Sequence, residues 1–517
     1  MNAPVLAGRS VRGATALRGG RPWRPTPYQV FGLLCWLVVS LAYWRVPLCC
    51  DAGLDAAVVE RLAADLLHPR HPVAALPGAG SPYYSPYAVA QGVLARWTGL
   101  GGWEVVRLAG PVNLLVLLIG VGRFVRMLTP RPWAPVLALA ALTLLWGTGP
   151  VPGGPSLALL PLTGGLQDPS VSTLGLTLWA WGLTGVRARD AGRVRFVGPS
   201  GLPGPLGYAA LGVPYGLVGL IDPVVGVGAG VGALTLIGCG RPRAVPRWGW
   251  AAVTATAVIW SWPYYDAFTA GFDHAIGDRS LMSAPAGSLI GACWLALLVG
   301  LPMLVVRAGC GSWRDPLVLM AVPGLAVVGY ALLDGRPVDG GLLDLALVPP
   351  QCAVAVELAV PRPWSVWRRA LGVVAVGGMC AGLLMAQGGA VLPGAFDQNR
   401  SSRSPYGVSY AWAAQHVGPG DVVLAVGRDT VHGLAGFGVD VVAPAVADPA
   451  LDEAARDDRL ADVRTYLSPG ATPAERAAVV RRHRVRWVLL TRWHTVPEGA
   501  VVVAWSERTG EVLARVG

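Results

Sequence analysis

Lysine is absent from this sequence of 517 residues, and charged residues make up only 14% of it. Soluble domains carry about 25% charged residues. The low charge, with 53% hydrophobic residues and a mean hydropathy of +0.51, therefore excludes an ordinary soluble protein. The composition is that of a chain that lies in a lipid bilayer. Arginine alone carries the positive charge, and we interpret the net charge of +11 as a signal of membrane topology and not of nucleic-acid binding.

Cysteine is scarce as well, with eight residues in the chain. Only the adjacent pair Cys49 and Cys50 falls outside the apolar segments and their cytoplasmic ends. Neighbouring cysteines rarely bond to each other, so we expect no disulfide framework. All seven histidines lie outside the apolar segments, and no pair has metal-ligand spacing on one helix face. We therefore predict no zinc site and no cofactor, and a divalent metal, for instance at Asp222, stays an open alternative.

Long apolar runs are what the sequence does contain. A bilayer core requires about 20 residues per helix, and on this criterion the chain predicts about eleven transmembrane helices. Glycine and proline within these runs are no objection, because helix packing in lipid favours small residues. The predicted spans lie near residues 28–47, 104–122, 132–148, 171–186, 205–221, 224–239, 247–263, 286–306, 315–333, 341–360 and 370–392.

The arginines give these spans an orientation. They are crowded into the N-terminal tail and into every second loop, whereas the intervening loops hold only Arg61, Arg70, Arg96, Arg279 and Arg336. Cytoplasmic loops are the ones enriched in positive charge. The pattern therefore predicts a multi-pass protein of the cytoplasmic membrane with a cytoplasmic N-terminus and an exterior segment after residue 392.

The first exterior segment, residues 48–103, is predicted to form two helices. Leu54, Val58, Leu62 and Leu66 recur every four residues and form one apolar stripe, which we expect to lie along the outer membrane surface. After a turn rich in proline and glycine, a second apolar helix runs from about residue 86 to 100. Tyr83 and Tyr84 at its start suit the headgroup level.

From residue 393 the composition changes, and residues 393–517 are predicted to form a small α/β domain. Valine-rich runs at 421–426, 438–443, 485–491 and 500–505 alternate with helical patterns at 405–417, 450–467 and 473–484. Thr472, Pro473 and Glu475 form the capping box of the last helix. The glycines at 433, 436 and 438 lack the dinucleotide pattern, so we reject a nucleotide site. A lid or an acceptor platform is the expected role.

Asp51 is the candidate catalytic residue. It lies a few residues beyond the first predicted span, where partial desolvation would raise the pKa of a carboxyl and make it a better base. The alternative is that Asp51 caps the following helix or only solvates the loop. Asp55, four residues on, takes the catalytic position if the first span is shorter.

Several short motifs resemble the GT-C superfamily of polytopic membrane glycosyltransferases. They comprise the Arg-rich tail and first span, the exterior loop that begins with an aspartate and holds two helices, Leu-Ile-Asp222-Pro-Val, Trp262-Pro-Tyr-Tyr-Asp266, and the segments around Asp440, 456–459, 472–476 and 485–490. The likeness covers nearly the whole chain. The sequence differs from the pattern of this superfamily in two places. The first loop lacks a paired acidic motif, and Asp222 stands where many relatives have histidine.

The resemblance implies that residues 28–392 form a transmembrane domain. This domain would transfer a sugar, with inversion, from a polyprenyl-phosphate donor in the membrane lipid to a glycan, lipid or protein acceptor outside. Asp51 would be the general base. A donor phosphate needs a cation, and arginine supplies two hydrogen bonds. The donor-binding candidates are Arg279, His274, Arg336, Asp222, Tyr83 and Tyr84, with Arg61 or Arg96 less favoured.

Two alternatives remain open. An inactive membrane scaffold with the same fold is compatible with the missing second acid of the first loop. A secondary transporter would need ionisable groups inside its spans. The predicted spans hold Asp344 and Glu357 as the main exceptions, and no internal repeat is evident.

Overall fold

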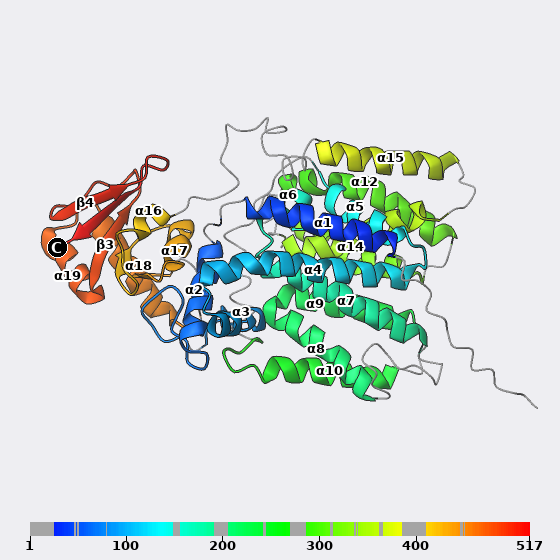
Figure 1. Cartoon of the computed structure of the whole chain (residues 1–517), viewed down its shortest axis with the longest axis horizontal. Helices are drawn as coiled ribbons and strands as arrows, with labels where there is room; N and C mark the ends of the chain where they lie inside the picture. The colour runs from blue at the N-terminus through cyan, green and yellow to red at the C-terminus, as the bar shows by residue number, and fades with distance from the viewer. Residues whose placement is uncertain are drawn as a thin grey trace, which may run out of the picture.

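The computed structural model describes residues 25–45, 48, 51–78, 80–147, 156–190, 205–240, 245–268, 286–310, 314–334, 338, 340–360, 366–384, 410–444, 448 and 450–517. These residues form a helical bundle and a small sheet domain at the C-terminal end of the chain. The two parts lie at opposite ends of an elongated molecule, with helix α2 between them (Figure 1).

A helix overlaps each of the predicted spans. These helices are α1 (Pro27–Trp44), α4 (Gly102–Leu128), α5 (Ala134–Leu144), α7 (Pro169–Asp190), α8 (Pro205–Ile221), α9 (Pro223–Gly238), α10 (Val245–Trp260), α12 (Ala286–Cys310), α13 (Pro316–Leu333), α14 (Gly340–Leu358) and α15 (Val366–Gly382). A short helix, α6 (Leu159–Gly164), lies between α5 and α7.

Five of these helices are long and apolar enough to cross a membrane: α1, α4, α12, α13 and α14. Others, including α5, α8 and α9, are apolar but shorter than 18 residues. The structure therefore confirms a predominantly helical protein with several membrane-spanning candidates. The count of about eleven spans stays a prediction.

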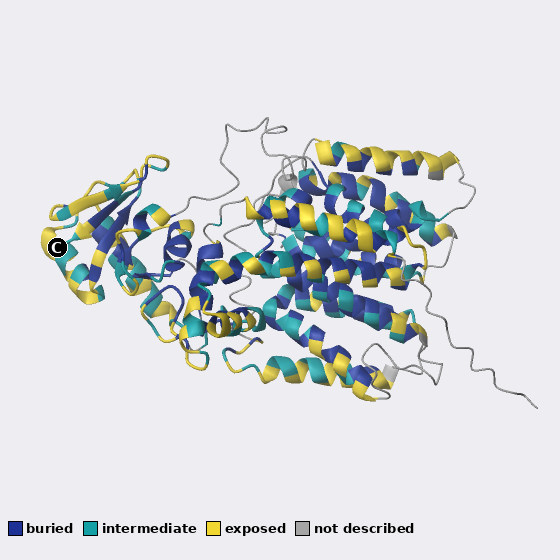
Figure 2. Cartoon of the chain, viewed as in Figure 1, coloured by how far each residue is buried: buried dark blue, intermediate teal, exposed yellow. Residues whose placement is uncertain are grey.

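The bundle buries its small residues and exposes many of its large apolar ones. Gly120 of α4 and Gly175 of α7 allow the two backbones to touch, since a Cβ on Gly120 would lie 2.2 Å from the carbonyl oxygen of Gly175. Leu33, Leu234 and Val305 are more than half exposed on the outer surface. Figure 2 shows the exposed residues along the outward sides of α1 and α15. Such a surface is stable only in lipid, which identifies a membrane protein.

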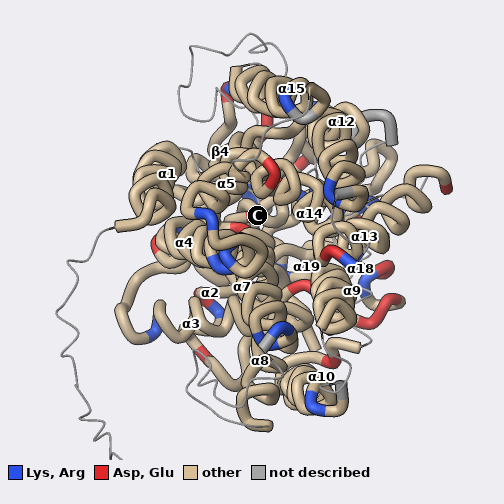
Figure 3. Tube along the Cα trace, turned by 90° about the vertical axis from the view of Figure 1, so that its right-hand side faces the viewer, with Lys and Arg blue, Asp and Glu red and all other residues tan. Residues whose placement is uncertain are grey.

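Arginines gather at the end of the bundle away from the sheet domain. Arg126 ends α4, Arg187 and Arg189 end α7, and Arg307 ends α12. Figure 3, seen from that end, shows basic segments at several helix termini. This placement agrees with the predicted cytoplasmic side, and the orientation of the termini in a membrane stays a prediction.

The two helices of the first loop are α2 (Asp51–Ala64) and α3 (Pro86–Thr98). The prediction that the apolar stripe of α2 lies on the membrane surface is wrong. Leu54, Val58 and Leu62 are at most 7% exposed and share a core with residues of the sheet domain. An amphipathic stripe shows that a face must be covered, but lipid and protein cover it equally well. The exposed Trp97 keeps α3 compatible with an interfacial position.

The sheet domain contains β1 (Val422–Leu424), β2 (Asp440–Val441), β3 (Val485–Leu490), β4 (Ala500–Trp505) and β5 (Val512–Val516) in the order β2-β1-β3-β5-β4. Strand β1 is parallel to β2 and β3, and β5 is antiparallel to β3 and β4. The helices are α16 (Ala411–Ala414), α17 (Arg428–Ala435), α18 (Glu453–Leu467) and α19 (Pro473–His483). The predicted strands are confirmed, as is the capping box that begins α19. The sequence analysis missed α17 and β5.

Candidate functional site

Asp51 is the first residue of α2 and faces α17 of the sheet domain. Its Oδ1 atom lies 3.0 Å from Nδ1 of His432 and 3.3 Å from a terminal nitrogen of Arg428. His432 and Arg428 are four residues apart in α17, so both side chains leave the same face of that helix. Residues nearly 400 positions apart in the chain thus meet at one carboxylate.

The carboxylate of Asp51 remains accessible and charged. Its side chain is 60% exposed, whereas those of His432 and Arg428 are 2% and 20% exposed. Desolvation opposes ionisation of Asp51, but the hydrogen bond from His432 and the charge of Arg428 outweigh it and lower the pKa of this carboxyl below its usual value. This reverses the sequence-based expectation of a raised pKa.

Asp55 behaves in the opposite way. Burial, followed by the charges of Asp168 and Asp51, raises the pKa of Asp55 well above its usual value. Burial also raises the pKa of Asp168, which precedes α7, with further contributions from Asp51 and Asp222 against the hydrogen bonds from Ser170. The four carboxyls Asp51, Asp55, Asp168 and Asp222 therefore lie near enough to influence one another. Among the described residues, no three form a metal-binding group.

Asp222 is 8% exposed and is the N-cap of α9, where its Oδ1 accepts a hydrogen bond from the Val225 N–H at 3.0 Å. This is the capping role that the sequence allows for an aspartate followed by proline. A contact between Asp222 and the donor stays a prediction.

The remaining donor-binding candidates divide into two groups. His274, Arg279 and Arg336 lie outside the described residues. Tyr84 is fully buried, and its hydroxyl donates to the Arg70 carbonyl, which favours a structural role. Tyr83 is partly buried, and its ring makes a T-shaped contact with the ring of His71. Arg61 is bound 2.7 Å from Asp440 of β2.

The sequence analysis missed Arg428, His432 and Asp168. Arg428 and His432 lie in the short helix α17. This helix was not predicted, because it has only eight residues and the glycines that follow it are typical of a loop. Asp168 directly precedes Pro169, the first residue of α7, so an Asp-Pro step before an apolar run was the available signal.

The sheet domain is held against the first loop by a shared core and by backbone contacts. Tyr410, Val431 and Leu434 pack with Leu54 and Val58 of α2. The Val441 N–H donates to the Val73 carbonyl at 2.8 Å, which ties β2 to the loop between α2 and α3. The domain is thus fixed where its α17 reaches Asp51.

The motif that follows α10 supports the same loop. The Trp262 indole donates to the Tyr84 carbonyl at 3.0 Å, and the Tyr264 hydroxyl donates to the Leu66 carbonyl at 2.5 Å. The Gly80 N–H donates in turn to the Tyr264 carbonyl at 2.9 Å. The Trp-Pro-Tyr-Tyr sequence therefore connects the bundle to the loop that carries Asp51.

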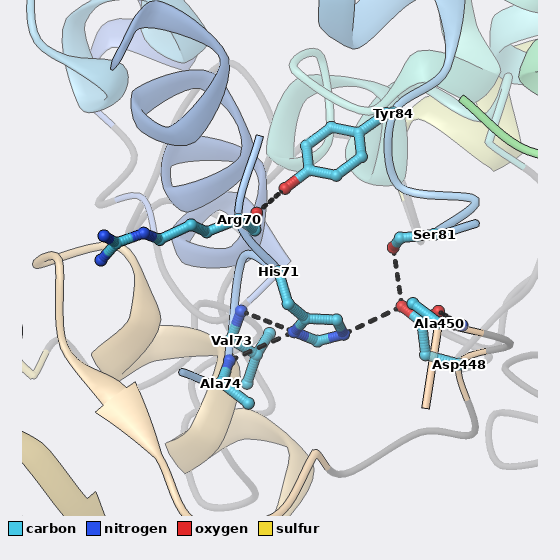
Figure 4. A network of polar contacts seen from close by, with 8 residues as sticks. All are labelled: Arg70, His71, Val73, Ala74, Ser81, Tyr84, Asp448 and Ala450. Atoms are coloured by element: carbon cyan, nitrogen blue, oxygen red, sulfur yellow. Dashed lines mark hydrogen bonds and ion pairs between the residues drawn. The ribbon is translucent and has the colours of Figure 1, made fainter. Parts of the chain in front are cut away.

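A buried polar network adds a second connection between the loop and the sheet domain (Figure 4). Asp448 accepts hydrogen bonds from His71 Nε2 at 3.0 Å and from Ser81 Oγ at 2.7 Å. The other ring nitrogen of His71 accepts from the backbone N–H groups of Val73 and Ala74, which assigns the proton of the neutral ring to Nε2. The side chains of His71 and Ser81 are fully buried, and that of Asp448 is 1% exposed.

The fold of the chain, a helical bundle with a loop that carries Asp51 and a docked sheet domain, is similar to the folds of two solved glycosyltransferases. The chain is similar over 95% of its length to the arabinofuranosyltransferase AftD from Mycobacteria, with 16% identity and a TM-score of 0.56. It spans only 40% of the AftD chain.

An oligosaccharyltransferase from Archaeoglobus fulgidus, tethered to an acceptor peptide, has a TM-score of 0.51 and 11% identity over 90% of this chain and 69% of its own. The same archaeal enzyme, AglB, in complex with an inhibitory peptide and a dolichol-phosphate has a TM-score of 0.50 and 12% identity over 90% of this chain and 70% of its own. These likenesses show a shared fold. No protein-family model matches the chain, and no curated protein matches it either.

Proposed function

We propose that the protein is a membrane glycosyltransferase that moves a sugar from a polyprenyl-phosphate donor to an acceptor outside the cytoplasmic membrane, with inversion at the anomeric carbon. One observation carries the proposal: an accessible carboxylate, Asp51, is fixed at the junction of the bundle and the sheet domain in a GT-C fold. The dolichol-phosphate bound to the archaeal neighbour supports a lipid-linked donor.

In the proposed reaction Asp51 acts as the general base. It takes the proton of the acceptor hydroxyl while that oxygen forms a bond to the anomeric carbon of the donor sugar. The bond between the anomeric carbon and the phosphate oxygen breaks, and polyprenyl phosphate leaves with the electron pair. Attack on the face opposite the leaving group inverts the anomeric carbon. Asp51 then returns its proton to the solvent.

The described geometry supports Asp51 over Asp55 for this step. Asp51 is ionised, 60% exposed and located at the end of α2, so a hydroxyl can approach it. Asp55 lies one turn further along the helix in a more buried position that favours its protonated form. The sheet domain beside this site would form part of the acceptor platform.

The test uses the full-length protein in lipid nanodiscs with labelled polyprenyl-phosphate sugars, beginning with the arabinofuranose donor that the AftD likeness suggests. Asp51→Asn should lower kcat about 10²- to 10⁴-fold, the usual contribution of a general base. Asp65→Asn is the matched control, because Asp65 is an exposed aspartate just after α2. Loss of activity in Asp55→Asn with retention in Asp51→Asn would move the base to Asp55. A folded wild type without any transfer would indicate an inactive scaffold.

A further inference from the structure

Helix α17 lies directly against the first turn of α2. A Cβ on Gly53 would be 2.6 Å from the carbonyl oxygen of His432, so the two backbones are already in contact. The Trp103 indole at the start of α4 donates to the Gly436 carbonyl just after α17 at 2.7 Å. The position of α17 relative to Asp51 is therefore set by its backbone contact with α2 and by the hydrogen bond from the Trp103 side chain.

Among the described residues, the two that contact the Asp51 carboxylate both come from α17. Both contacts reach Oδ1, from His432 at 3.0 Å and from Arg428 at 3.3 Å. Among the described residues no contact is found for Oδ2, and the side chain is 60% exposed. Oδ1 is thus held by the sheet domain, while the side chain as a whole stays accessible.

The groups that keep Asp51 charged come from the sheet domain. Among the described residues, the titratable and charged groups near Asp51 are Asp55 of α2, Asp168 before α7, and Arg428 and His432 of α17. Burial favours protonation of Asp51, and among the described residues the α17 side chains oppose this. The bundle by itself therefore provides the carboxylate, while the sheet domain provides what keeps it charged.

We propose that His432 and Arg428 are positioning residues that hold the Asp51 carboxylate by Oδ1 and leave Oδ2 to receive the acceptor proton. The sheet domain is then part of the catalytic machinery itself. This inference rests on the proposed function, and it assigns to α17 a role that a lid or a platform would not require.

The test is the pH dependence of kcat in nanodiscs, measured on pairs of variants. His432→Phe removes the ring nitrogens, whereas His432→Asn keeps an N–H near the position of Nδ1; Arg428→Gln removes the charge, whereas Arg428→Lys keeps it. We expect His432→Phe and Arg428→Gln to lower kcat at neutral pH about 10- to 100-fold, as misplaced catalytic groups do, with little change in KM. Activity requires ionised Asp51, so its acidic limit should move to higher pH. The conservative variants should restore part of both effects.

Two controls match these variants within the same domain. His416→Gln alters an exposed histidine, and Arg486→Gln removes a surface ion pair with Asp421. Neither should change kcat or the acidic limit. Equal loss of activity at every pH in the α17 variants would show a merely structural role and overturn the inference, as would unchanged kinetics.

A second measurement does not depend on activity. In a variant with Cys49 and Cys50 replaced by serine, Asp51→Cys and His432→Cys should be joined by a short bifunctional thiol reagent, detected by mass spectrometry. Absence of this crosslink in folded protein would overturn the contact itself. A crosslinked protein whose wild type transfers no sugar from any donor would instead overturn the proposed function.

Discussion

Gly53 of α2 and Gly436 at the end of α17 pack backbone against backbone. A Cβ on Gly436 would lie 2.7 Å from the Cα of Gly53, closer than real side-chain atoms approach one another. This pair of glycines permits the contact through which α17 reaches Asp51. The location of the candidate site thus depends on two residues that have no chemistry of their own.

Replacing Gly53 by alanine should separate α17 from α2. The added methyl group would meet the His432 carbonyl oxygen at 2.6 Å, and such overpacking costs about 1–3 kcal/mol. We expect Gly53→Ala to reduce kcat while leaving the bundle folded. Transfer assays and hydrogen exchange across residues 428–441 would measure the two effects.

Gly249→Ala is the control for this substitution. Gly249 lies within α10, and an added Cβ there meets no atom within 4 Å. Its replacement should leave both readouts unchanged. A Gly53→Ala protein with native exchange protection in α17 would contradict the predicted separation.

The network of His71, Ser81 and Asp448 should make the docking of the sheet domain sensitive to acid. Burial opposes ionisation of Asp448, but its hydrogen bonds from His71, Ala450 and Ser81 lower its pKa. A lowered pKa stabilises the folded state above the usual carboxyl pKa of about 3.9, and this stabilisation is lost as the pH falls through the lowered pKa. Hydrogen exchange of residues 71–78, followed from about pH 5 down to about pH 2, would detect the loss.

Asp448→Asn should weaken docking at neutral pH by about 1–3 kcal/mol, the usual cost of an unsatisfied buried group, and should flatten its acid dependence. Asp462→Asn offers a matched control, because Asp462 also binds a histidine, His483, at 2.8 Å but within the sheet domain. That variant should leave exchange of residues 71–78 unaltered. Equal effects in both variants would show that the Asp448 network has no special role in docking.

Asp55→Asn is expected to stabilise the protein at neutral pH. Burial and neighbouring carboxylates raise the pKa of Asp55, so its contribution to stability is full below about pH 3.9 and is lost as the pH rises through the raised pKa. Asparagine removes this charge. The increase in Tm over wild type should therefore widen between acidic and alkaline pH. An unchanged difference would disprove the electrostatic origin. Asp65→Asn should not show this widening, because hydrogen bonds from the His68 and Leu67 N–H groups lower the pKa of Asp65.

Asp344 should prove structural and not part of a transport pathway. It is fully buried in α14 and accepts hydrogen bonds from the backbone and side chain of Ser156 at 2.8 and 2.5 Å. We expect Asp344→Ala to lower stability by about 1–3 kcal/mol because the Ser156 donors lose their acceptor. Ser156→Ala should lower the free energy of unfolding by part of the same amount. Sugar transfer should persist in both the Asp344→Ala and the Ser156→Ala proteins. Abolished transfer in a stable Asp344→Asn protein would contradict a purely structural role.

Much of the fold follows from local patterns. A helix overlaps each predicted apolar span, since a long apolar run leaves a chain in lipid few other ways to satisfy its backbone hydrogen bonds. The Thr472 capping box and the strand at 485–490 were likewise predictable, because their signals lie within a few residues. The helix α17 was not, because its eight residues are short and are followed by glycines that imitate a loop.

The candidate site was only half predictable. Asp51 and Asp55 stand out because a carboxylate near the end of an apolar span is unusual whatever the rest of the chain does. Their different pKa directions, the Asp51 contacts with His432 and Arg428, and the protein-covered face of α2 depend on residues hundreds of positions away. The periodicity of apolar residues predicts that one face of a helix is buried, and the composition predicts that the chain lies in lipid. Only the packed chain decides which partner covers that surface and which charges face one another, because these are distances in space with no fixed relation to distance along the sequence.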